Sequence, residues 1–516
     1  MVAVMAFTGT LYPFQEEAHE LMSGRGQMML CMVMGSGKTP TALATLETLF
    51  ERDEITRALI VVPASLKYQW LGEVKRFSTS RVVVIDGPPK ARETLWRAAI
   101  SCQYVIANAE MLQNDVKYLD KIRVDAIVID EATLIKSPAA KRSRFLKRIG
   151  KRSPYRYALT GQPIENRPEE LFSIMEFVDP TILGRFDLFD RTFIVRDRWG
   201  KPIRYRNLNH LHESLSDVMY RKTREDIQDQ LPEIITKVVP VTFDVSGAKA
   251  YRMISSDLLK KINDAIGKMG RGFDLWRHYN ALGGEAQGEI MSRMTVLRML
   301  CDNPDLVRTS ARLFSEDGDK GSAYAAHIVK AGWLKSVSKS PKLDAVVEYI
   351  KGILDEDPGN KVVVFSFFRQ NLQLLEMALY GTTKCTTFMG GMSSHDKEQS
   401  KRKFGTDPDV RVFLSSDAGG YGVDLPMANH LISYDLPWSA GKLDQRESRI
   451  IRLSSEFPHV TITSFVMRGS IEERQYAMLQ EKRLINRAFI DKGYDARGQF
   501  EITLGSLSDF LSAADV

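Results

Sequence analysis

Cysteine is scarce in this sequence, and the few cysteines are scattered. Cys31, Cys102, Cys301 and Cys385 include no Cys-x-x-Cys pair, and the eight histidines do not cluster with them. This distribution argues against a structural zinc site and against a disulfide framework. The thiols are expected to stay reduced, in a cytoplasmic or otherwise intracellular setting.

Long hydrophobic runs are missing as well. No stretch reaches the roughly 18 apolar residues that a membrane-spanning helix needs. The short apolar run at the start of the sequence has no basic residue before it, so a signal peptide is not expected. These features predict that the protein has no membrane partner.

Neither sign of charge dominates. The 71 Lys and Arg residues against 65 Asp and Glu residues leave a net charge of +6, which permits a nucleic-acid partner without requiring one. Hydrophobic residues make up 44% of the 516 positions, which is enough for a buried core and excludes a disordered chain. This length suggests about two or three domains.

Short apolar runs alternate with longer mixed segments in two parts of the chain. Each run ends in turn or polar residues, a pattern that predicts buried strands of parallel sheets with helices between them. The runs lie at 27–33, 57–62, 81–85, 103–107, 126–129 and 155–159, and again at 361–365, 385–388, 410–414, 430–434 and 460–465.

The chain changes character between these two groups of runs. Residues 179–230 are polar, aromatic and basic, and residues 246–331 have the spacing of helices. The pattern predicts an α/β fold of two units, 1–235 and 236–516, each built on a parallel sheet flanked by helices. Insertions are expected at about 180–235 in the first unit and at about 246–335, mainly helical, in the second.

A glycine-rich segment follows the first run and precedes a predicted helix over 40–52. Its glycines would let backbone N–H groups face phosphates, Lys38 would reach the β and γ phosphates of ATP, and the Thr39 hydroxyl would bind Mg²⁺. The usual pattern is incomplete because Met32 stands at its first glycine position, and a chance glycine-rich loop is the alternative. The residues expected to hold ATP here are Met34, Gly35, Ser36, Gly37, Lys38 and Thr39.

Two carboxylates end the run at 126–129. Asp130 could complete the Mg²⁺ shell together with Thr39, and Glu131 could orient and activate the attacking water. The alternative is a pair of solvated acids at a strand end. The phosphate loop upstream in the same unit favours the catalytic interpretation.

Three polar residues recur at helical spacing in the second unit. Gln445, Arg449 and Arg452 stand at i, i+4 and i+7, which predicts one shared helix face. Two guanidinium groups together could stabilise charge on a γ-phosphate. On its own, this pattern fits a salt-bridged surface helix better.

A basic run follows the two carboxylates. It could contact a phosphate backbone, or it could be a solvated helix face. Residues 136–156 hold nine basic side chains and no acid: Lys136, Lys141, Arg142, Arg144, Lys147, Arg148, Lys151, Arg152 and Arg156.

In their order along the chain, these motifs resemble those of the Swi/Snf-type ATPases of helicase superfamily two, which are DNA translocases. The compact form is similar to bacterial or phage members. The resemblance implies two RecA-like lobes with helical insertions, a catalytic set of Lys38, Asp130, Glu131, Arg449 and Arg452, and the cofactors ATP and Mg²⁺. In it, Arg449 and Arg452 are arginine fingers delivered by the second lobe.

The resemblance also assigns further contacts. Gln15, in the segment 11–15, would read the adenine base, and Gly422 and Asp424 would contribute to the nucleotide site. Asp424 is a departure, because the family often has Asn there. The implied DNA contacts are Pro63, Lys67, Asn108, Lys136, Lys141, Arg142, Arg369 and Ser416. Pro63 and Lys67 belong to a segment that continues to Gln69 and Trp70.

The implied activity is ATP-dependent movement along double-stranded DNA, or remodelling of it, without conventional strand separation. A branch-migration or fork-reversal enzyme acting on branched DNA would use the same motor, and an ATPase that recycles RNA polymerase would carry further domains. From a different class, the chain could be a non-catalytic DNA-binding scaffold that retains the fold. Intact Lys38, Asp130, Glu131 and Arg452 argue against the scaffold.

Overall fold

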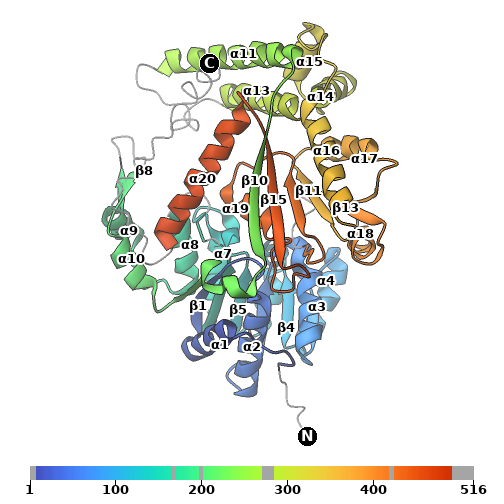
Figure 1. The fold of residues 1–516 in the computed structure, drawn as a ribbon. Helices are drawn as coiled ribbons and strands as arrows, with labels where there is room; N and C mark the ends of the chain where they lie inside the picture. Colours follow the sequence, from blue (N-terminus) through green and yellow to red (C-terminus); the bar gives the residue numbers. More distant parts are fainter. Residues whose placement is uncertain are drawn as a thin grey trace. The chain divides into compact units, whose positions relative to one another are not determined.

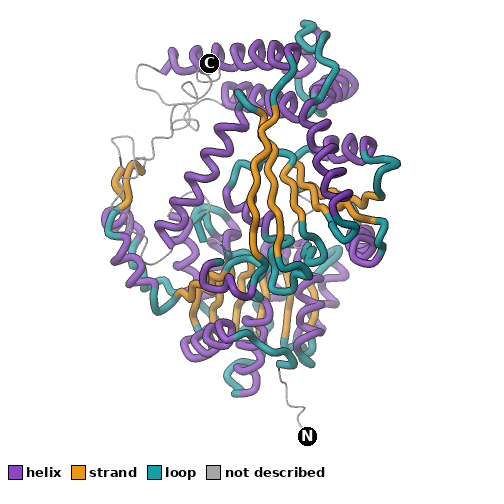
Figure 2. Tube along the Cα trace, in the orientation of Figure 1, coloured by secondary structure: helices purple, strands orange, loops and turns teal. Residues whose placement is uncertain are grey.

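The computed structural model describes residues 7–161, 163–164, 169–196, 202–269, 284–417 and 423–490. The chain forms two compact units: the first holds the described residues up to Leu231, the second runs from Pro232 to Glu481, and the chain returns to the first unit at Lys482. Each is an α/β unit, and the order of its elements can be followed by colour in Figure 1. Figure 2 shows the strands of each unit in orange among purple helices.

The first unit is built on a seven-stranded parallel sheet with the order β3-β4-β2-β5-β6-β1-β9. All six predicted apolar runs are confirmed as strands. The seventh strand was not predicted, because its Met-Tyr-Arg-Lys sequence is mostly polar and only half-buried at the sheet edge. The strands are β1 (Gln27–Met32), β2 (Ala58–Val61), β3 (Val82–Val84), β4 (Tyr104–Ala107), β5 (Ala126–Asp130), β6 (Tyr155–Thr160) and β9 (Met219–Lys222).

Helices connect these parallel strands. In α2, Leu43, Leu46 and Leu49 are fully buried, as the 3.6-residue spacing predicts. Residues 180–215 contain two helices and an antiparallel hairpin of β7 (Ile194–Arg196) and β8 (Pro202–Tyr205). The helices are α1 (Pro13–Arg25), α2 (Lys38–Glu51), α3 (Lys67–Phe77), α4 (Pro89–Ala99), α5 (Ala109–Asn114), α6 (Val116–Leu119), α7 (Lys141–Gly150), α8 (Glu169–Val178), α9 (Phe186–Phe193) and α10 (Leu208–Leu215).

The second unit has a six-stranded parallel sheet with the order β10-β15-β14-β11-β13-β12. The five predicted runs are confirmed, and an edge strand joins them along β15. The strands are β10 (Glu233–Val241), β11 (Val362–Ser366), β12 (Lys384–Phe388), β13 (Val410–Ser416), β14 (His430–Ser433) and β15 (His459–Met467).

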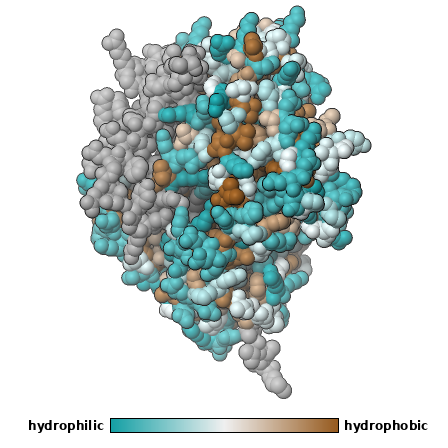
Figure 3. All heavy atoms as spheres, viewed as in Figure 1, coloured by the Kyte–Doolittle hydropathy of each residue, from teal (hydrophilic) through white to brown (hydrophobic). Residues whose placement is uncertain are grey.

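The edge strand β10 escaped prediction because most of it is exposed, so it lacks a buried apolar run. Ile235 and Val238 are 39% and 42% exposed. Figure 3 shows brown hydrophobic patches near the middle of the drawn face, among hydrophilic side chains. The expected unit boundary after residue 235 lies within this strand.

The inserted segment of the second unit is helical. The described helices of this unit are α11 (Val245–Met269), α13 (Gly284–Asp302), α14 (Pro304–Glu316), α15 (Ala323–Lys330), α16 (Pro341–Glu356), α17 (Arg369–Ala378), α18 (Ser394–Thr406), α19 (Ala440–Glu447) and the part of α20 (Ile471–Ile490) up to Glu481. Among the described helices, none combines the length and the apolar composition needed to cross a membrane.

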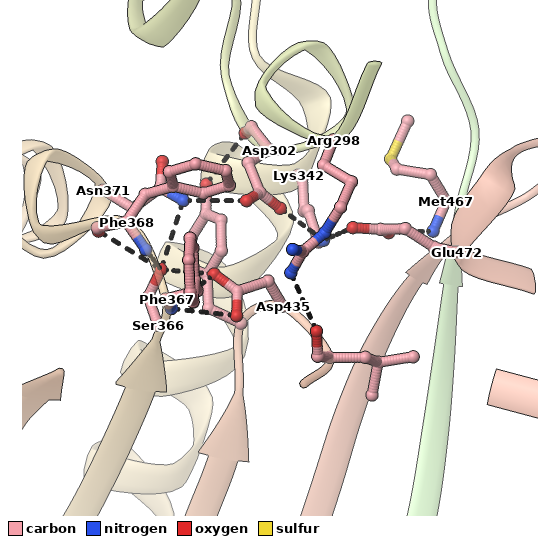
Figure 4. Close-up of polar contacts among 12 residues, drawn as sticks. Arg298, Asp302, Lys342, Ser366, Phe367, Phe368, Asn371, Asp435, Met467 and Glu472 are labelled. Atoms are coloured by element: carbon pink, nitrogen blue, oxygen red, sulfur yellow. Dashed lines mark hydrogen bonds and ion pairs between the residues drawn. The ribbon is translucent and has the colours of Figure 1, made fainter. Parts of the chain in front are cut away.

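A buried ionic cluster joins the inserted helices to this sheet (Figure 4). The Lys342 ammonium group, fully buried at the start of α16, lies 2.8 Å from Asp302 Oδ1 and 2.6 Å from Glu472 Oε1. Asn371 Nδ2 donates to Asp302 Oδ2 at 3.0 Å and to Ser366 Oγ at 3.3 Å, which extends the cluster to the end of β11. The cluster therefore fixes α13, α16 and α20 against the carboxyl ends of the strands.

Candidate nucleotide and DNA sites

The phosphate loop connects β1 to α2. Gly35 and Gly37 have φ values of 83° and 81°, a region that side chains with a Cβ atom rarely adopt. The Ser36 hydroxyl donates to the carbonyl oxygen of Val33 at 2.6 Å and tightens the turn. The first N–H groups of α2 are therefore presented at the end of the loop, as anion binding requires.

Lys38 is the first residue of α2, and its side chain lies over the loop. Its ammonium group donates to the carbonyl oxygens of Met32 and Val33 at 3.0 and 3.2 Å. Thr39 follows in the first turn and is half-buried. The expected phosphate-binding residues, from Met34 to Thr39, thus form one loop and helix start.

Gln15, on α1, contacts this loop directly. Its Nε2 donates to the carbonyl oxygen of Ser36 at 2.8 Å, and its Oε1 accepts from the Tyr12 N–H at 2.9 Å. A Cβ atom on Gly37 would clash with Gln15 Nε2, so the present position of the Gln15 side chain depends on glycine there. The adenine contact of Gln15 stays a prediction.

Asp130 ends β5 and is held by two donors. Trp70 Nε1 donates to Asp130 Oδ2 at 2.8 Å, and the Glu131 N–H donates to Oδ1 at 2.9 Å. Burial raises the pKa of the Asp130 carboxyl above its usual value, while the Trp70 hydrogen bond and the charge of Lys38 act in the opposite direction. The link to Trp70 is a site contact that sequence reasoning missed.

Glu131 has an unusual backbone conformation. Its φ and ψ are 53° and 63°, in the left-handed region, where a residue other than glycine costs about 1–3 kcal/mol. The turn leaves β5 at once, so that Asp130 and Glu131 project from the same end of the strand. Because parallel strands share one carboxyl edge, this pair and the phosphate loop lie at the same edge of the sheet.

The Trp70 hydrogen bond gives a testable pH effect. In Trp70→Phe, we expect the pKa of Asp130 to rise further, because a bond that favours the carboxylate lowers its pKa and is lost. The acid limb of the pH profile of ATP hydrolysis should move to higher pH by about one unit, with rates converging at high pH. Trp96→Phe is the matched control, since Trp96 Nε1 donates to Asp115 Oδ2 at 3.0 Å. Equal shifts in both variants, or none in Trp70→Phe, would contradict this role.

The basic run divides into two groups around α7. Some members are already paired: Lys147 Nζ lies 2.6 Å from Glu176 Oε2, Arg152 Nη1 lies 2.6 Å from Asp120 Oδ1, and Arg142 lies 3.9 Å from Glu110. Lys147 Nζ also donates to Ser173 Oγ at 2.7 Å, so this side chain joins α7 to α8, and burial lowers its pKa. The exposed members without an ion pair to any described residue are Lys141, Arg144, Arg148 and Lys151.

Other expected DNA contacts of the first unit are less accessible. Lys67 is only 2% exposed, because its ammonium group turns inward to Asp86 Oδ1 at 2.9 Å and to the carbonyl oxygen of Ile85. Asn108 is buried, and its Nδ2 donates to Glu110 Oε2 at 2.8 Å. Pro63 and Lys136 are half-buried. Lys67 is therefore removed from the proposed DNA contacts.

The prediction that Gln445, Arg449 and Arg452 share one helix face is wrong. Helix α19 ends at Glu447, before both arginines. The Ser448 hydroxyl donates back to the Gln445 carbonyl oxygen at 3.0 Å. After Ser448, the carbonyl oxygen of Arg449 accepts from the N–H of Leu425 at 2.9 Å. The chain has therefore left the helix and pairs with the segment that contains Leu425.

A carboxylate nevertheless brings the two arginines together. Arg449 Nη1 lies 3.9 Å from Asp424 Oδ1, and Arg452 Nη2 forms an ion pair with the same oxygen. Arg449 and Arg452 are largely buried, whereas Asp424 is 36% exposed. The three residues form one cluster in the second unit.

The remaining predicted residues of the second unit are dispersed. Arg369 is exposed at the start of α17. Ser416, at the end of β13, is buried, and its hydroxyl oxygen accepts from the Gly390 N–H at 3.1 Å. Gly422 lies outside the described residues.

The residues of the phosphate loop fit a nucleotide with its metal. The glycine cradle and helix start suit phosphate oxygens, and Lys38 supplies the cation. The Asp130 carboxylate and the Thr39 hydroxyl are oxygen ligands of the kind that Mg²⁺ prefers. Elsewhere in the described part of the chain, no group of three or more His, Cys, Asp or Glu side chains is arranged for a metal ion.

Comparisons with known proteins agree with this geometry. The family model of the SNF2-related domain matches residues 14–306, and that of the helicase conserved C-terminal domain matches residues 341–454. An uncharacterized ATP-dependent helicase of Bacillus subtilis (strain 168), YqhH, is 26% identical over 95% of this chain and 78% of its own length. The DNA annealing helicase and endonuclease ZRANB3 of Homo sapiens is 28% identical over 98% of this chain.

The chain spans only 42% of the length of human ZRANB3. Among solved structures, the helicase domain of Hef from Pyrococcus furiosus is similar, with a TM-score of 0.52 over 90% of this chain and 97% of that chain, at 14% identity. The structural likeness supports the fold alone, which is that of two RecA-like lobes.

Proposed function

Because the chain belongs to the family of proteins with an SNF2-related domain, we propose that it is an ATP-dependent translocase of double-stranded DNA. In this proposal it moves along or remodels the duplex, inside the cell, without conventional strand separation. One observation carries it: the phosphate loop and the Asp130–Glu131 pair lie at one edge of the same parallel sheet. That arrangement suits hydrolysis of a nucleoside triphosphate.

Each residue has a stated part in the reaction. Lys38 and the N–H groups of α2 bind the β and γ phosphates, and Thr39 and Asp130 would hold Mg²⁺, which would supply Lewis-acid stabilisation of the phosphate oxygens. Glu131 orients the attacking water and accepts its proton. Arg449 and Arg452 neutralise charge that develops on the transferred phosphoryl group.

A second candidate is an annealing activity on branched DNA. The likeness to human ZRANB3, an annealing helicase by name, over 98% of this chain favours it. The two candidates differ in substrate and share the motor. Comparing the two requires the same ATP hydrolysis assay on several DNA structures.

The test measures ATP turnover with single-stranded, duplex, forked and four-way DNA, together with strand displacement. For a translocase, we expect strong stimulation by plain duplex and no displacement of a strand. Stimulation by forks or junctions but not by duplex would favour annealing activity. Binding of DNA without any ATP hydrolysis would refute the proposed function and support the alternative of a non-catalytic DNA-binding scaffold.

The exposed basic side chains of α7 and the residue after it are the proposed phosphate contacts. In a variant with Lys141, Arg144, Arg148 and Lys151 changed to Gln, we expect weaker binding to duplexes of every sequence. The slope of log affinity against log salt should flatten by about 0.9 for each lost contact. Arg152→Gln is the control, because Arg152 is exposed but already paired with Asp120. An unchanged slope in the fourfold variant would show that these residues do not contact DNA phosphates and form an ordinary solvated surface.

A further inference from the structure

The one arginine of helix α19, Arg446, is buried and bridges two carboxylates. Arg446 is only 3% exposed. Its Nε and Nη2 donate to the two carboxylate oxygens of Asp417 at 2.6 and 2.9 Å, in the two-pronged geometry that only a guanidinium group provides. Its Nη1 donates to the carbonyl oxygen of Asp435 at 2.5 Å, and Nη2 also lies 3.2 Å from Asp435 Oδ1.

The Arg446 bridge, formed by Arg446, Asp417 and Asp435, joins three neighbouring strands. Asp417 directly follows β13, and Asp435 comes two positions after the end of β14. The Asp435 carboxylate accepts from the Ser366 hydroxyl and from the Phe367 N–H at the end of β11 (Figure 4). The carboxyl ends of β14, β11 and β13 are thus tied to one side chain of α19.

The bridge stands between two sets of proposed functional residues. On the strand side, the exposed Arg369 comes two positions after Phe367, and Ser416, which was expected to contact DNA but is buried, immediately precedes Asp417. On the helix side, Arg449 follows Arg446 by three positions and leads to Arg452. An exposed proposed DNA contact, Arg369, therefore adjoins the strand ends that the bridge holds, and the proposed fingers follow the helix that carries it.

The electrostatics favour a rigid connection. Burial alone would raise the pKa of Asp417, but the Arg446 guanidinium group brings this pKa below its usual value. Both partners therefore stay charged over the neutral range, and a buried charge pair has few alternative geometries that keep its hydrogen bonds. A displacement of the end of β13 or β11 would move α19 with it.

We propose that Arg446 is a positioning residue that transmits DNA contact at the ends of β11 and β13 to Arg449 and Arg452. This inference rests on the proposed function, because it assigns a route by which DNA stimulates hydrolysis. Arg446 touches neither ATP nor DNA in this scheme. Packing alone would not require it, since apolar residues can replace buried ion pairs without loss of stability.

The test compares Arg446→Lys, Asp417→Asn and the double variant with the unaltered protein. For each, ATP turnover is measured with and without duplex DNA, together with the affinity for ATP. We expect the ratio of stimulated to basal turnover to fall about tenfold in each single variant, with ATP affinity retained. The double variant should be no worse than either single variant, because both changes cut the same link.

The matched control is Arg92→Lys. Arg92, which is also buried, forms a two-pronged pair with Asp115, at 2.7 and 2.9 Å, in the first unit. A purely structural contact should lower both turnovers in proportion and keep their ratio, as we expect for this control. Asp417→Asn changes the shape of the side chain least and serves if Arg446→Lys does not fold.

The outcomes separate this inference from the proposed function. If duplex DNA fails to stimulate the unaltered protein, the proposed function is refuted. Suppose that duplex DNA stimulates the unaltered protein. If the variants then keep its ratio of stimulated to basal turnover, or if the double variant shows the sum of the two single effects, Arg446 is not the connection. A reduced ratio in Arg92→Lys as well would equally overturn the specific role of the bridge.

Discussion

Glu131→Gln is expected to bind ATP with Mg²⁺ and to hydrolyse it about 10²–10⁴-fold more slowly. The amide keeps the size and hydrogen-bonding reach of the carboxylate but cannot accept the proton of the attacking water. Asp130 and Thr39, the proposed metal ligands, are unchanged, and the donors from Trp70 and the Glu131 backbone still hold Asp130. Nucleotide affinity and single-turnover hydrolysis, measured on the same preparation, check this prediction.

The behaviour of Glu131→Gln is interpreted by comparison with Lys38→Ala. Lys38→Ala should lose hydrolysis too, but together with ATP affinity, because the phosphates lose their cation. The left-handed backbone of Glu131 is the same for Gln, so loss of the fold is not expected from strain. If Glu131→Gln bound ATP as weakly as Lys38→Ala, Glu131 would belong to the metal shell instead. Normal turnover would remove it from the catalytic residues.

Buried parallel strands were predictable from the sequence, because a strand covered on both faces must be apolar throughout. The runs at 126–129 and 410–414 correspond to β5 and β13 within a few residues. Strands β9 and β10 escaped because they form sheet edges, where exposed positions are tolerated. Their place is decided by pairing with β1 and β15, which no local pattern encodes.

The phosphate loop was predictable for a related reason. Gly35, Gly37 and Lys38 act through local backbone geometry, so their spacing alone indicates the chemistry. The contacts that orient this site are different, because they join residues far apart in the chain. Trp70 reaches Asp130 across 60 positions, and Arg446 reaches Asp417 across 29.

Charge counting also has a physical limit. The basic run at 136–156 contains no acid, yet Lys147 and Arg152 are neutralised by Glu176 and Asp120 from other segments. Likewise, Lys67 lies in a segment of the expected kind but turns inward to Asp86. Only the fold reveals which cations remain at the surface, where a phosphate backbone could reach them.

Arg452→Ala is expected to lower DNA-stimulated turnover by about 10³–10⁵-fold, the range for catalytic arginine fingers. Lys38 and Glu131 belong to the first unit and Arg452 to the second. Arg452 would therefore act on the γ-phosphate only when both units engage the same nucleotide. ATP affinity should change much less, because the arginine contributes mainly in the transition state.

The ion pair with Asp424 sharpens this prediction. Because Asp424 Oδ1 contacts both Arg452 and Arg449, Arg452→Ala leaves Arg449 as the sole partner of that oxygen within this cluster. Arg449→Ala should therefore also lower DNA-stimulated turnover, but less than Arg452→Ala does. Arg452→Lys keeps the positive charge, so its turnover should be higher than that of Arg452→Ala. Turnover, ATP affinity and nucleotide-free DNA affinity are measured on all three variants. If Arg452→Ala lost DNA binding but kept stimulated hydrolysis, the Asp424 cluster would be a DNA contact, and catalysis by two units would be wrong for this protein.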